Sequence, residues 1–245
     1  MMIPLWTMWM KMTQISFLTR LFDLLAPRAC PMCGRRLSIS EQPLCAACNL
    51  ALPRTNYHEN ALENPVARLF WGKFPIEKGA AFLFYKPHSS TSRLIYKLKY
   101  FDSPEIGYTL GQLVASEYMA QNFFHNITAL VPVPLTRKRI IKRGYNQSVE
   151  IARGIKSITG LPIIENAVKR THFSESQTHK DQWSRLKNVE NAFQLCHPEK
   201  LSNQHILLID DVMTTGATLT SLAKELMKAE NIKISVLALC FAADK

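Results

Sequence analysis

The stretch Ile206-Leu-Leu-Ile-Asp-Asp-Val-Met-Thr-Thr-Gly-Ala-Thr218 decides the fold. Its four aliphatic residues predict a buried strand, which two carboxylates follow at the carboxyl end before a hydroxyl-rich turn. From Leu219 onward the apolar residues recur at helical spacing, so a helix begins at this turn. A strand that passes through a short turn into a helix is typical of an open α/β sheet, where ligands bind at the carboxyl ends of the strands.

The turn has the chemistry of a sugar-phosphate site. A helix N-terminus offers free backbone N–H groups and partial positive charge to an anion, and a glycine lets the backbone approach that anion closely. The predicted phosphate-binding residues are Thr214, Thr215, Gly216, Ala217 and Thr218. Asp210 and Asp211 would repel phosphate, so they suit a polyol such as ribose, or a magnesium ion held through water. The alternative is an ordinary turn whose Asp and Thr side chains only cap the helix.

Charge is concentrated in one part of the chain. The 245 residues suffice for one full α/β domain and a small appendage, and the net charge is +11. Residues 131–190 hold twelve Lys and Arg against five Asp and Glu. Such a concentration fits a polyanion, either a substrate that bears pyrophosphate or a nucleic acid.

Four of the six cysteines form two Cys-x-x-Cys pairs, Cys30 with Cys33 and Cys45 with Cys48. Each pair can turn two thiolates toward one point, so the two pairs complete a tetrahedral zinc site. Disulfides are the alternative in an oxidising compartment. We favour zinc in a structural role, because four thiolates leave no open position for a substrate. Cys196 and Cys240 lie in apolar strands and are expected in the core.

The first 26 residues are predicted to be a tail and an amphipathic helix. The apolar start is short, Lys11 interrupts it, and no basic region precedes it. We therefore expect no signal peptide, no stable membrane insertion and a cytoplasmic protein. Five of the nine methionines lie in the first twelve positions, which suggests that translation begins at Met12. The zinc finger is predicted over residues 27–56 and the α/β domain over residues 75–245. A Pro- and Asn-containing stretch, Pro53 to Pro65, is expected to link the two.

A second anion site is predicted behind the strand that ends at Pro132 and Pro134. Five cations in seven positions form a loop there. A solvated charged surface normally includes acidic residues as well, and this segment has none. These residues are Arg137, Lys138, Arg139, Lys142 and Arg143. Gly144 allows a turn, and Asn146 can cap the helix that follows. Arginine would supply forked hydrogen bonds to pyrophosphate or DNA, and lysine a point charge.

Two further basic segments leave their roles open. Residues 91–101 carry Arg93, Lys97 and Lys99 among Tyr96, Tyr100 and Phe101. This mixture suits the bases and phosphates of a single strand, but an amphipathic helix with solvated lysines explains it slightly better. Residues 169–193 are expected to begin as a loop that closes over the site. Its candidate contact residues are Gln177, Arg185 and Asn188.

The end of the first quoted stretch resembles the phosphoribosyl pyrophosphate (PRPP) motif of type I phosphoribosyltransferases. The resemblance implies that Asp210 and Asp211 lie at the ribose hydroxyls and that residues 214–218 surround the 5-phosphate. Magnesium would accompany PRPP. The branch that acts on hypoxanthine and guanine carries an Asp where this chain has Thr214. The acidic group that serves that branch near its base is therefore absent.

Four cues occur in the order typical of the ComF/GntX family. They are the cysteine pairs; Val131-Pro-Val-Pro with Arg143-Gly-Tyr-Asn-Gln-Ser148; Arg170…Gln177…Arg185-Leu-Lys-Asn-Val…Ala-Phe193; and the PRPP-like motif. That resemblance implies a zinc finger on a phosphoribosyltransferase-like parallel sheet flanked by helices. It also implies a part in natural transformation, with single-stranded DNA handled in the cytoplasm. A helicase or other DNA-uptake machinery could be a partner. Two hypotheses follow: a DNA-uptake factor that binds PRPP, or an active phosphoribosyltransferase with an unidentified nitrogenous acceptor. No catalytic base or acceptor element is evident, so the first is preferred.

Overall fold

The computed structural model describes residues 28–38, 41, 43–100, 103–171 and 192–242. The chain divides into two compact units, Met1–Ala51 and Leu52–Lys245. In the first unit, the short helix α3 (Ala46–Leu50) begins at the second cysteine pair, where the Cys45 sulfur accepts a hydrogen bond from the Cys48 backbone N–H. The predicted helix within residues 1–26 lies outside the described residues.

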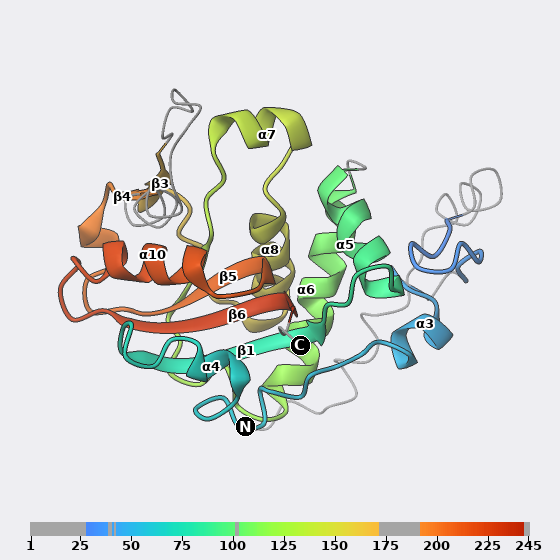
Figure 1. The fold of residues 1–245 in the computed structure, drawn as a ribbon, viewed down its shortest axis with the longest axis horizontal. Helices are drawn as coiled ribbons and strands as arrows, with labels where there is room; N and C mark the ends of the chain where they lie inside the picture. Colours follow the sequence, from blue (N-terminus) through green and yellow to red (C-terminus); the bar gives the residue numbers. More distant parts are fainter. Residues whose placement is uncertain (1–27, 39–40, 42, 101–102, 172–191, 243–245) are drawn as a thin grey trace, which may run out of the picture. The chain divides into compact units, whose positions relative to one another are not determined.

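The second unit is built on a parallel sheet. Its strands are β1 (Ile76–Phe84), β2 (Ala129–Pro132), β5 (His205–Met213) and β6 (Lys233–Phe241), in the order β1-β6-β5-β2 (Figure 1). All three pairings are parallel, with Leu207 beside both Leu130 and Ser235. The side chains of β5 and β6 are nearly all buried, as strands covered on both faces require. A separate antiparallel pair joins β3 (Val168–Arg170) to β4 (Phe193–Leu195).

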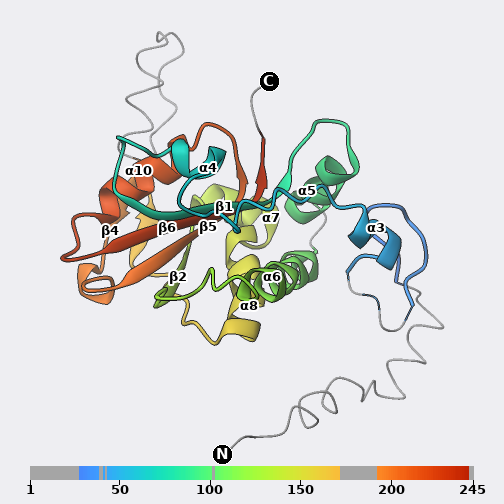
Figure 2. The same cartoon turned by 90° about the horizontal axis from the view of Figure 1, so that it is seen from below.

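Helices cover both faces of the sheet, as Figures 1 and 2 show from two directions. One face carries α4 (Pro65–Arg68) and α10 (Ala217–Leu226), and their apolar side chains share a core cluster with β1, β2, β5 and β6. The other face carries α6 (Pro104–Met119) and α8 (Gln147–Thr159). The remaining helices are α5 (Ser90–Tyr100), α7 (Arg137–Arg143) and a 3-10 turn, η2 (Pro198–Lys200). The predicted parallel α/β sheet flanked by helices is confirmed.

Helices α6 and α8 approach at backbone distance. A Cβ built on Gly154 would lie 1.9 Å from the Tyr108 carbonyl oxygen, and one on Gly111 would lie 2.2 Å from that of Ile151. Only glycine fits at these crossing points, which lets α8 pack directly against α6. Asn146 caps α8 as predicted, because its side chain accepts from the Ser148 N–H. The N-terminus of α8 is thereby held beside the end of β5.

Residues 52–74 belong to the second unit, although the α/β domain was expected to begin at residue 75. The Asn64 side chain caps α4 and donates to the Gly79 carbonyl oxygen, and Val66 and Phe70 are fully buried. This segment therefore forms part of the core and does not serve as a linker. Cys240 is buried as expected, whereas Cys196 is exposed, because it follows the last residue of the short strand β4.

Candidate functional site

The two carboxylates of β5 have different partners. Neighbouring residues of a strand point to opposite faces. The Asp210 Oδ1 atom accepts from the Asp211 backbone N–H at 2.9 Å and lies 3.5 Å from the Ser148 hydroxyl of α8. The Asp211 carboxylate forms an ion pair of 3.2 Å with Lys99 of α5. The Asp210 carboxylate therefore lies beside the turn that follows β5, whereas the Asp211 carboxylate is held by Lys99 of α5.

A cavity of about 220 Å³ opens where β5 passes into α10. Asp210 lines it together with the residues of the predicted phosphate turn, which are Thr214, Thr215, Gly216, Ala217 and Thr218. We call this cavity the cup. Thr214, Thr215 and Ala217 are exposed, so a ligand can reach them. The structure thus brings the predicted turn residues and one of the two carboxylates to one cavity.

Gly216 gives the cup its shape. It adopts a left-handed backbone conformation with φ +72° and precedes the first residue of α10. It contributes no side chain to cap the helix, and a Cβ there would lie 2.8 Å from Phe70 Cε1. The amino end of α10 therefore faces the cavity without a side-chain cap, a geometry suited to an anion.

Charges around Asp210 determine its protonation. Burial, followed by the charge of Asp211, raises the pKa of Asp210 to about 7, against the opposing charges of Lys99 and Arg170. Burial also lowers the pKa of Arg170 from its usual range, as does the charge of Arg139, whereas Asp210 raises it. The Arg170 guanidinium lies 5.2 Å from the centre of the Phe193 ring. Two basic side chains, Lys99 of α5 and Arg170 of β3, therefore act on this one carboxyl group.

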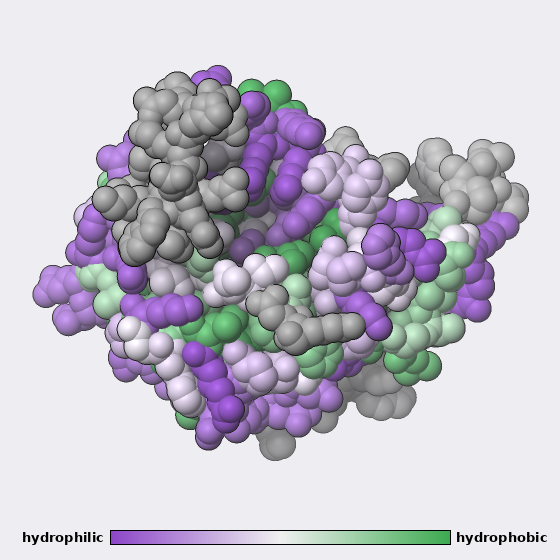
Figure 3. All heavy atoms as spheres, in the orientation of Figure 1, coloured by the Kyte–Doolittle hydropathy of each residue, from purple (hydrophilic) through white to green (hydrophobic). Residues whose placement is uncertain are grey.

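The basic segment that was predicted to be a loop is a helix, α7. Thr136 caps its first turn by accepting from the Arg139 N–H, and Gly144 ends it with φ +80°. A capping residue followed by a glycine at this spacing is a helix signal that charge counting overlooked. The exposed cations are Arg137, Lys138, Arg139 and Lys142. Figure 3 shows hydrophilic residues gathered over this helix.

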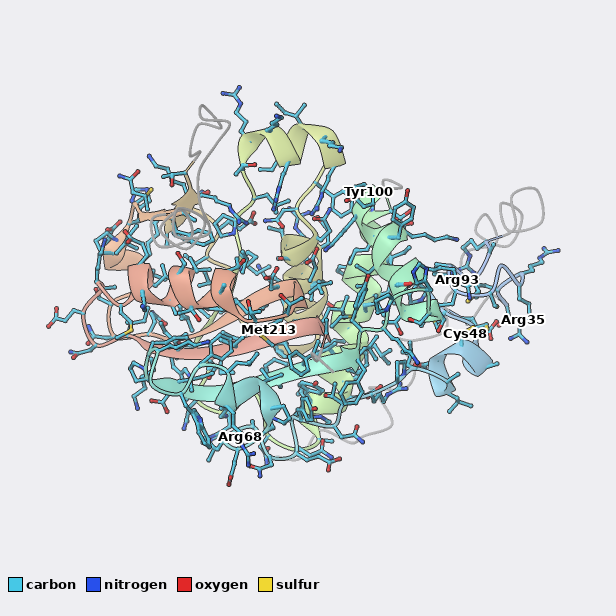
Figure 4. The ribbon with its side chains drawn as sticks, in the orientation of Figure 1. Arg35, Cys48, Arg68, Arg93, Tyr100 and Met213 are labelled. Carbon is cyan, nitrogen blue, oxygen red and sulfur yellow. The ribbon has the colours of Figure 1, made fainter. Side chains whose placement is uncertain are left out.

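Arg143 differs from the other four cations of α7, because it is held in place. Its guanidinium donates to Gln147 Oε1 at 2.7 Å and lies 5.8 Å from the centre of the Tyr100 ring. It therefore connects the end of α7 to α8 and α5. In Figure 4, Tyr100 lies at the end of α5 nearest α7.

Three residues near the cup were not among the predicted site residues: Lys99, Ser148 and Arg170. No local pattern distinguishes Lys99 from the other lysines of its helix, since its role depends on the distant Asp211. Ser148 and Arg170 lie within motifs that carry the family resemblance, and this resemblance is the signal that could have identified them as site residues. The loop candidates Gln177, Arg185 and Asn188 lie outside the described residues, and their roles stay predictions.

The four cysteines of the first unit form a candidate metal centre. Their sulfur atoms all lie within 4.8 Å of one another, and Cys33 and Cys45 are 3.8 Å apart. A tetrahedron with Zn–S distances of about 2.3 Å has S–S edges of about 3.8 Å, so the set fits zinc. The Glu41 carboxylate accepts from the Ser38 and Ala46 N–H groups, which braces the loop between the pairs.

The parallel sheet flanked by helices, with a cup where β5 passes into α10, defines an α/β domain of the ligand-binding type, and a four-cysteine unit precedes it in the sequence. No family model matches the chain. Its sequence is 31% identical over 153 residues to competence protein F of Haemophilus influenzae, across 60% of this chain and 67% of that protein. It is 27% identical over 232 residues to DNA utilization protein YhgH of Escherichia coli K12, across 89% and 98% of the two. The chain belongs to the ComF family of competence-related proteins.

Among solved structures, the chain is similar to glutamine PRPP amidotransferase from B. subtilis, with a TM-score of 0.39, 16% identity and coverage of 57% of this chain and 30% of that one. It is also similar to hypoxanthine phosphoribosyltransferase from Trypanosoma cruzi, with a TM-score of 0.34, 12% identity and coverage of 59% and 79%. Among the described residues, none of the helices combines the length and apolar character needed to cross a membrane.

Proposed function

We propose that the cup binds PRPP or a related ribose phosphate, and that the protein uses this site together with a single-stranded-DNA-binding surface in DNA uptake. The observation that carries the proposal is the cup itself, where an uncapped helix N-terminus, exposed threonines and a carboxyl group line one cavity. Backbone N–H groups and the hydroxyls of Thr214, Thr215 and Thr218 would hold the 5-phosphate. Asp210 would accept hydrogen bonds from the ribose hydroxyls.

Magnesium fits the same end of β5. It prefers oxygen ligands, keeps several waters and takes one or two carboxylates together with substrate phosphates. Asp210 is the carboxylate that would face it, whereas Asp211 is already paired with Lys99. The ion would neutralise phosphate charge that Asp210 otherwise repels.

The exposed cations of α7 supply the second half of the proposal. Four basic side chains on seven residues, with Arg170 near Arg139, suit pyrophosphate or the backbone of a single strand. The printed names of the relatives, competence protein and DNA utilization protein, favour DNA. The proposed place of action is the cytoplasm, and a helicase or other DNA-uptake component is a proposed partner.

Calorimetric titration with PRPP and magnesium tests the cup. At pH 8, above the pKa of about 7 of Asp210, Asp210→Asn should weaken binding at least about ten-fold, because the ribose loses a charged acceptor whose hydrogen bonds contribute about 1.5–3 kcal/mol. Glu230→Gln makes the same chemical change at an exposed position that does not line the cup, and should bind as the wild type does. Equal affinities for all three proteins would refute the ribose assignment.

Salt dependence tests the DNA surface. The logarithm of affinity for a single strand should fall linearly with the logarithm of salt, by about 0.7 for each phosphate neutralised. Replacing Arg137, Lys138 and Arg139 with glutamine should lower that slope by up to about 2. Lys156→Gln, in the last turn of α8, is the matched control. An unchanged slope in the triple variant would exclude α7 from the contact.

A second candidate function, phosphoribosyl transfer to a nitrogenous acceptor, gains support from Asp210. A carboxyl group with a pKa of about 7 can take a proton from an acceptor near neutral pH. The rest of such catalysis would come from positioning and electrostatic stabilisation of the leaving pyrophosphate. Pyrophosphate release measured across a panel of bases and amines tests it. Absence of release with every acceptor, in protein that binds PRPP, would leave binding as the function.

A further inference from the structure

A second and larger cavity adjoins the cup. It has a volume of about 940 Å³ and lies between α5, the segment that follows β1, and the end of β5. Val212 and Thr214 line both cavities, so a ligand in the cup has direct access to the larger space. Ligand sites of small molecules have volumes of about 300–1,000 Å³. The larger cavity can therefore hold a substantial group attached to, or beside, the sugar phosphate.

Aromatic rings dominate one wall of this cavity. Tyr96 and Tyr100 lie one turn apart on α5, with ring centres 4.9 Å apart and planes inclined by 44°. They are 56% and 51% exposed, which leaves ring surface accessible to a ligand. Tyr85 lines the same cavity at the end of β1. Because every base has a π face, such rings serve as stacking platforms.

Cations accompany the rings. Arg93 and Lys99 come from the same helix and line the cavity, and Lys99 lies at its boundary with β5 through the ion pair with Asp211. Both side chains are donors only, so they match the carbonyl oxygens and ring nitrogens of a heterocycle. Figure 4 shows Arg93 and Tyr100 on the same helix, Tyr100 nearer α7. The cavity thus offers stacking surfaces and hydrogen-bond donors beside a phosphate cup.

We propose that this cavity, which we call the ring subsite, holds a planar nitrogen heterocycle next to the ribose phosphate of the cup. The inference rests on the proposed function of the cup, because a ribose phosphate bound there would explain why the two cavities adjoin. It supplies the acceptor-recognition element that the sequence did not reveal. Such a ring has two sources, a free nucleobase or an unstacked base of a single strand, and both present the same chemistry to Tyr96.

Fluorescence titration of the zinc-loaded full chain with a short single strand carrying 2-aminopurine tests the ring subsite. Tyr96→Leu should weaken binding of this strand at least about five-fold, because a base loses its aromatic stacking partner. Tyr96→Phe, which keeps the ring, should bind as the wild type does. Tyr108→Leu removes a half-exposed tyrosine from α6, outside the cavity lining, and is the matched control. An abasic strand of equal length should bind all four proteins equally.

Each arm separates one explanation from another. The proposal would be overturned if Tyr96→Leu weakened binding of the base-bearing and the abasic strand alike, or of neither strand. Free adenine that binds in the presence of PRPP and is lost in Tyr96→Leu would identify a free base as the ligand. If Tyr96→Leu weakens binding of the oligonucleotide and free adenine does not bind, the ligand is a base of a single strand. If PRPP fails to bind the wild type while the Tyr96 effect persists, the proposed function of the cup fails and the ring subsite stands.

Discussion

The Lys99 ammonium lies 3.2 Å from the Asp211 carboxylate, and this ion pair connects helix α5 to strand β5. Their side chains are only 21% and 13% exposed, so solvent screens the pair weakly. Lys99 lines the ring subsite, and Asp211 lies directly between Asp210 and Val212, both of which line the cup. The pair therefore joins a wall of the ring subsite to the strand whose end lines the cup.

Lys99→Met should destabilise the protein. The substitution leaves a largely buried carboxylate without its partner, a loss of about 1–3 kcal/mol in the free energy of unfolding. Denaturant unfolding measures it, and Lys97→Met, on the same helix but outside the cavity lining, is the control. Equal stability of the two variants would mean that the ion pair contributes nothing.

Gly216→Ala should cost more than an ordinary glycine substitution. A left-handed backbone costs a non-glycine residue about 1–2 kcal/mol. Gly160 has the comparable φ of +75° but open space around its Cβ position, whereas a Cβ at Gly216 contacts the Phe70 ring at 2.8 Å. Thermal unfolding should therefore show a larger loss for Gly216→Ala than for Gly160→Ala. Equal losses would show that Phe70 yields without cost.

Stability should fall as Asp210 loses its proton. The pKa of Asp210 is raised from 3.8 to about 7, so between these values the folded state holds a proton that the unfolded state has lost. The stabilisation is full below about pH 4 and is lost as the pH rises through about 7. At about 1.4 kcal/mol per pKa unit, its upper bound is about 4 kcal/mol.

Asp210→Asn should remove this dependence, because an amide has no proton to lose. The variant should gain thermal stability over the wild type at pH 8, and the gain should shrink toward pH 5. Parallel melting profiles across that range would contradict the assignment of a raised pKa to Asp210.

Zinc removal should unfold the first unit and spare the second. The described part of the first unit has a small core and depends on the four-cysteine cluster, whereas the second unit has its own sheet and core. Elemental analysis should find one zinc per chain, lost in Cys33→Ser and retained in Cys196→Ser. Hydrogen exchange after chelation should rise in residues 28–51 only. Zinc retention in Cys33→Ser would argue against the tetrahedral site.

Local signals in the sequence predicted much of the architecture. The strand, acids, turn and helix around Gly216 are contiguous, so their order alone indicated a ligand site at the end of β5. The same holds for the two cysteine pairs, whose spacing indicates that their sulfur atoms meet. These features require no knowledge of distant contacts.

The features that escaped prediction depend on distant contacts or on weak local signals. The ion pair of Asp211 with Lys99, on a helix more than a hundred residues earlier, had no local signal, and the place of Asp211 at the ribose stays a prediction. Residues 53–65 have the Pro and Asn content of a linker, yet Asn64 is buried and caps α4. The helix α7 was not predicted because its sequence is mostly basic and has no apolar stripe at helical spacing. Thr136 and Gly144 nevertheless mark its two ends.

The order of the strands has a consequence for synthesis. Strand β6 separates β1 from β5, so the earliest strand of the second unit has no neighbour in its sheet until residues 233–241 are made. Non-local parallel pairing of this kind is slow, and it leaves edges exposed meanwhile. The edge of β1 that pairs with β6 therefore stays unpaired through most of translation, whereas its other edge can already bond to residues 53–55. A ribosome that stalls before codon 233 would release a product prone to aggregate.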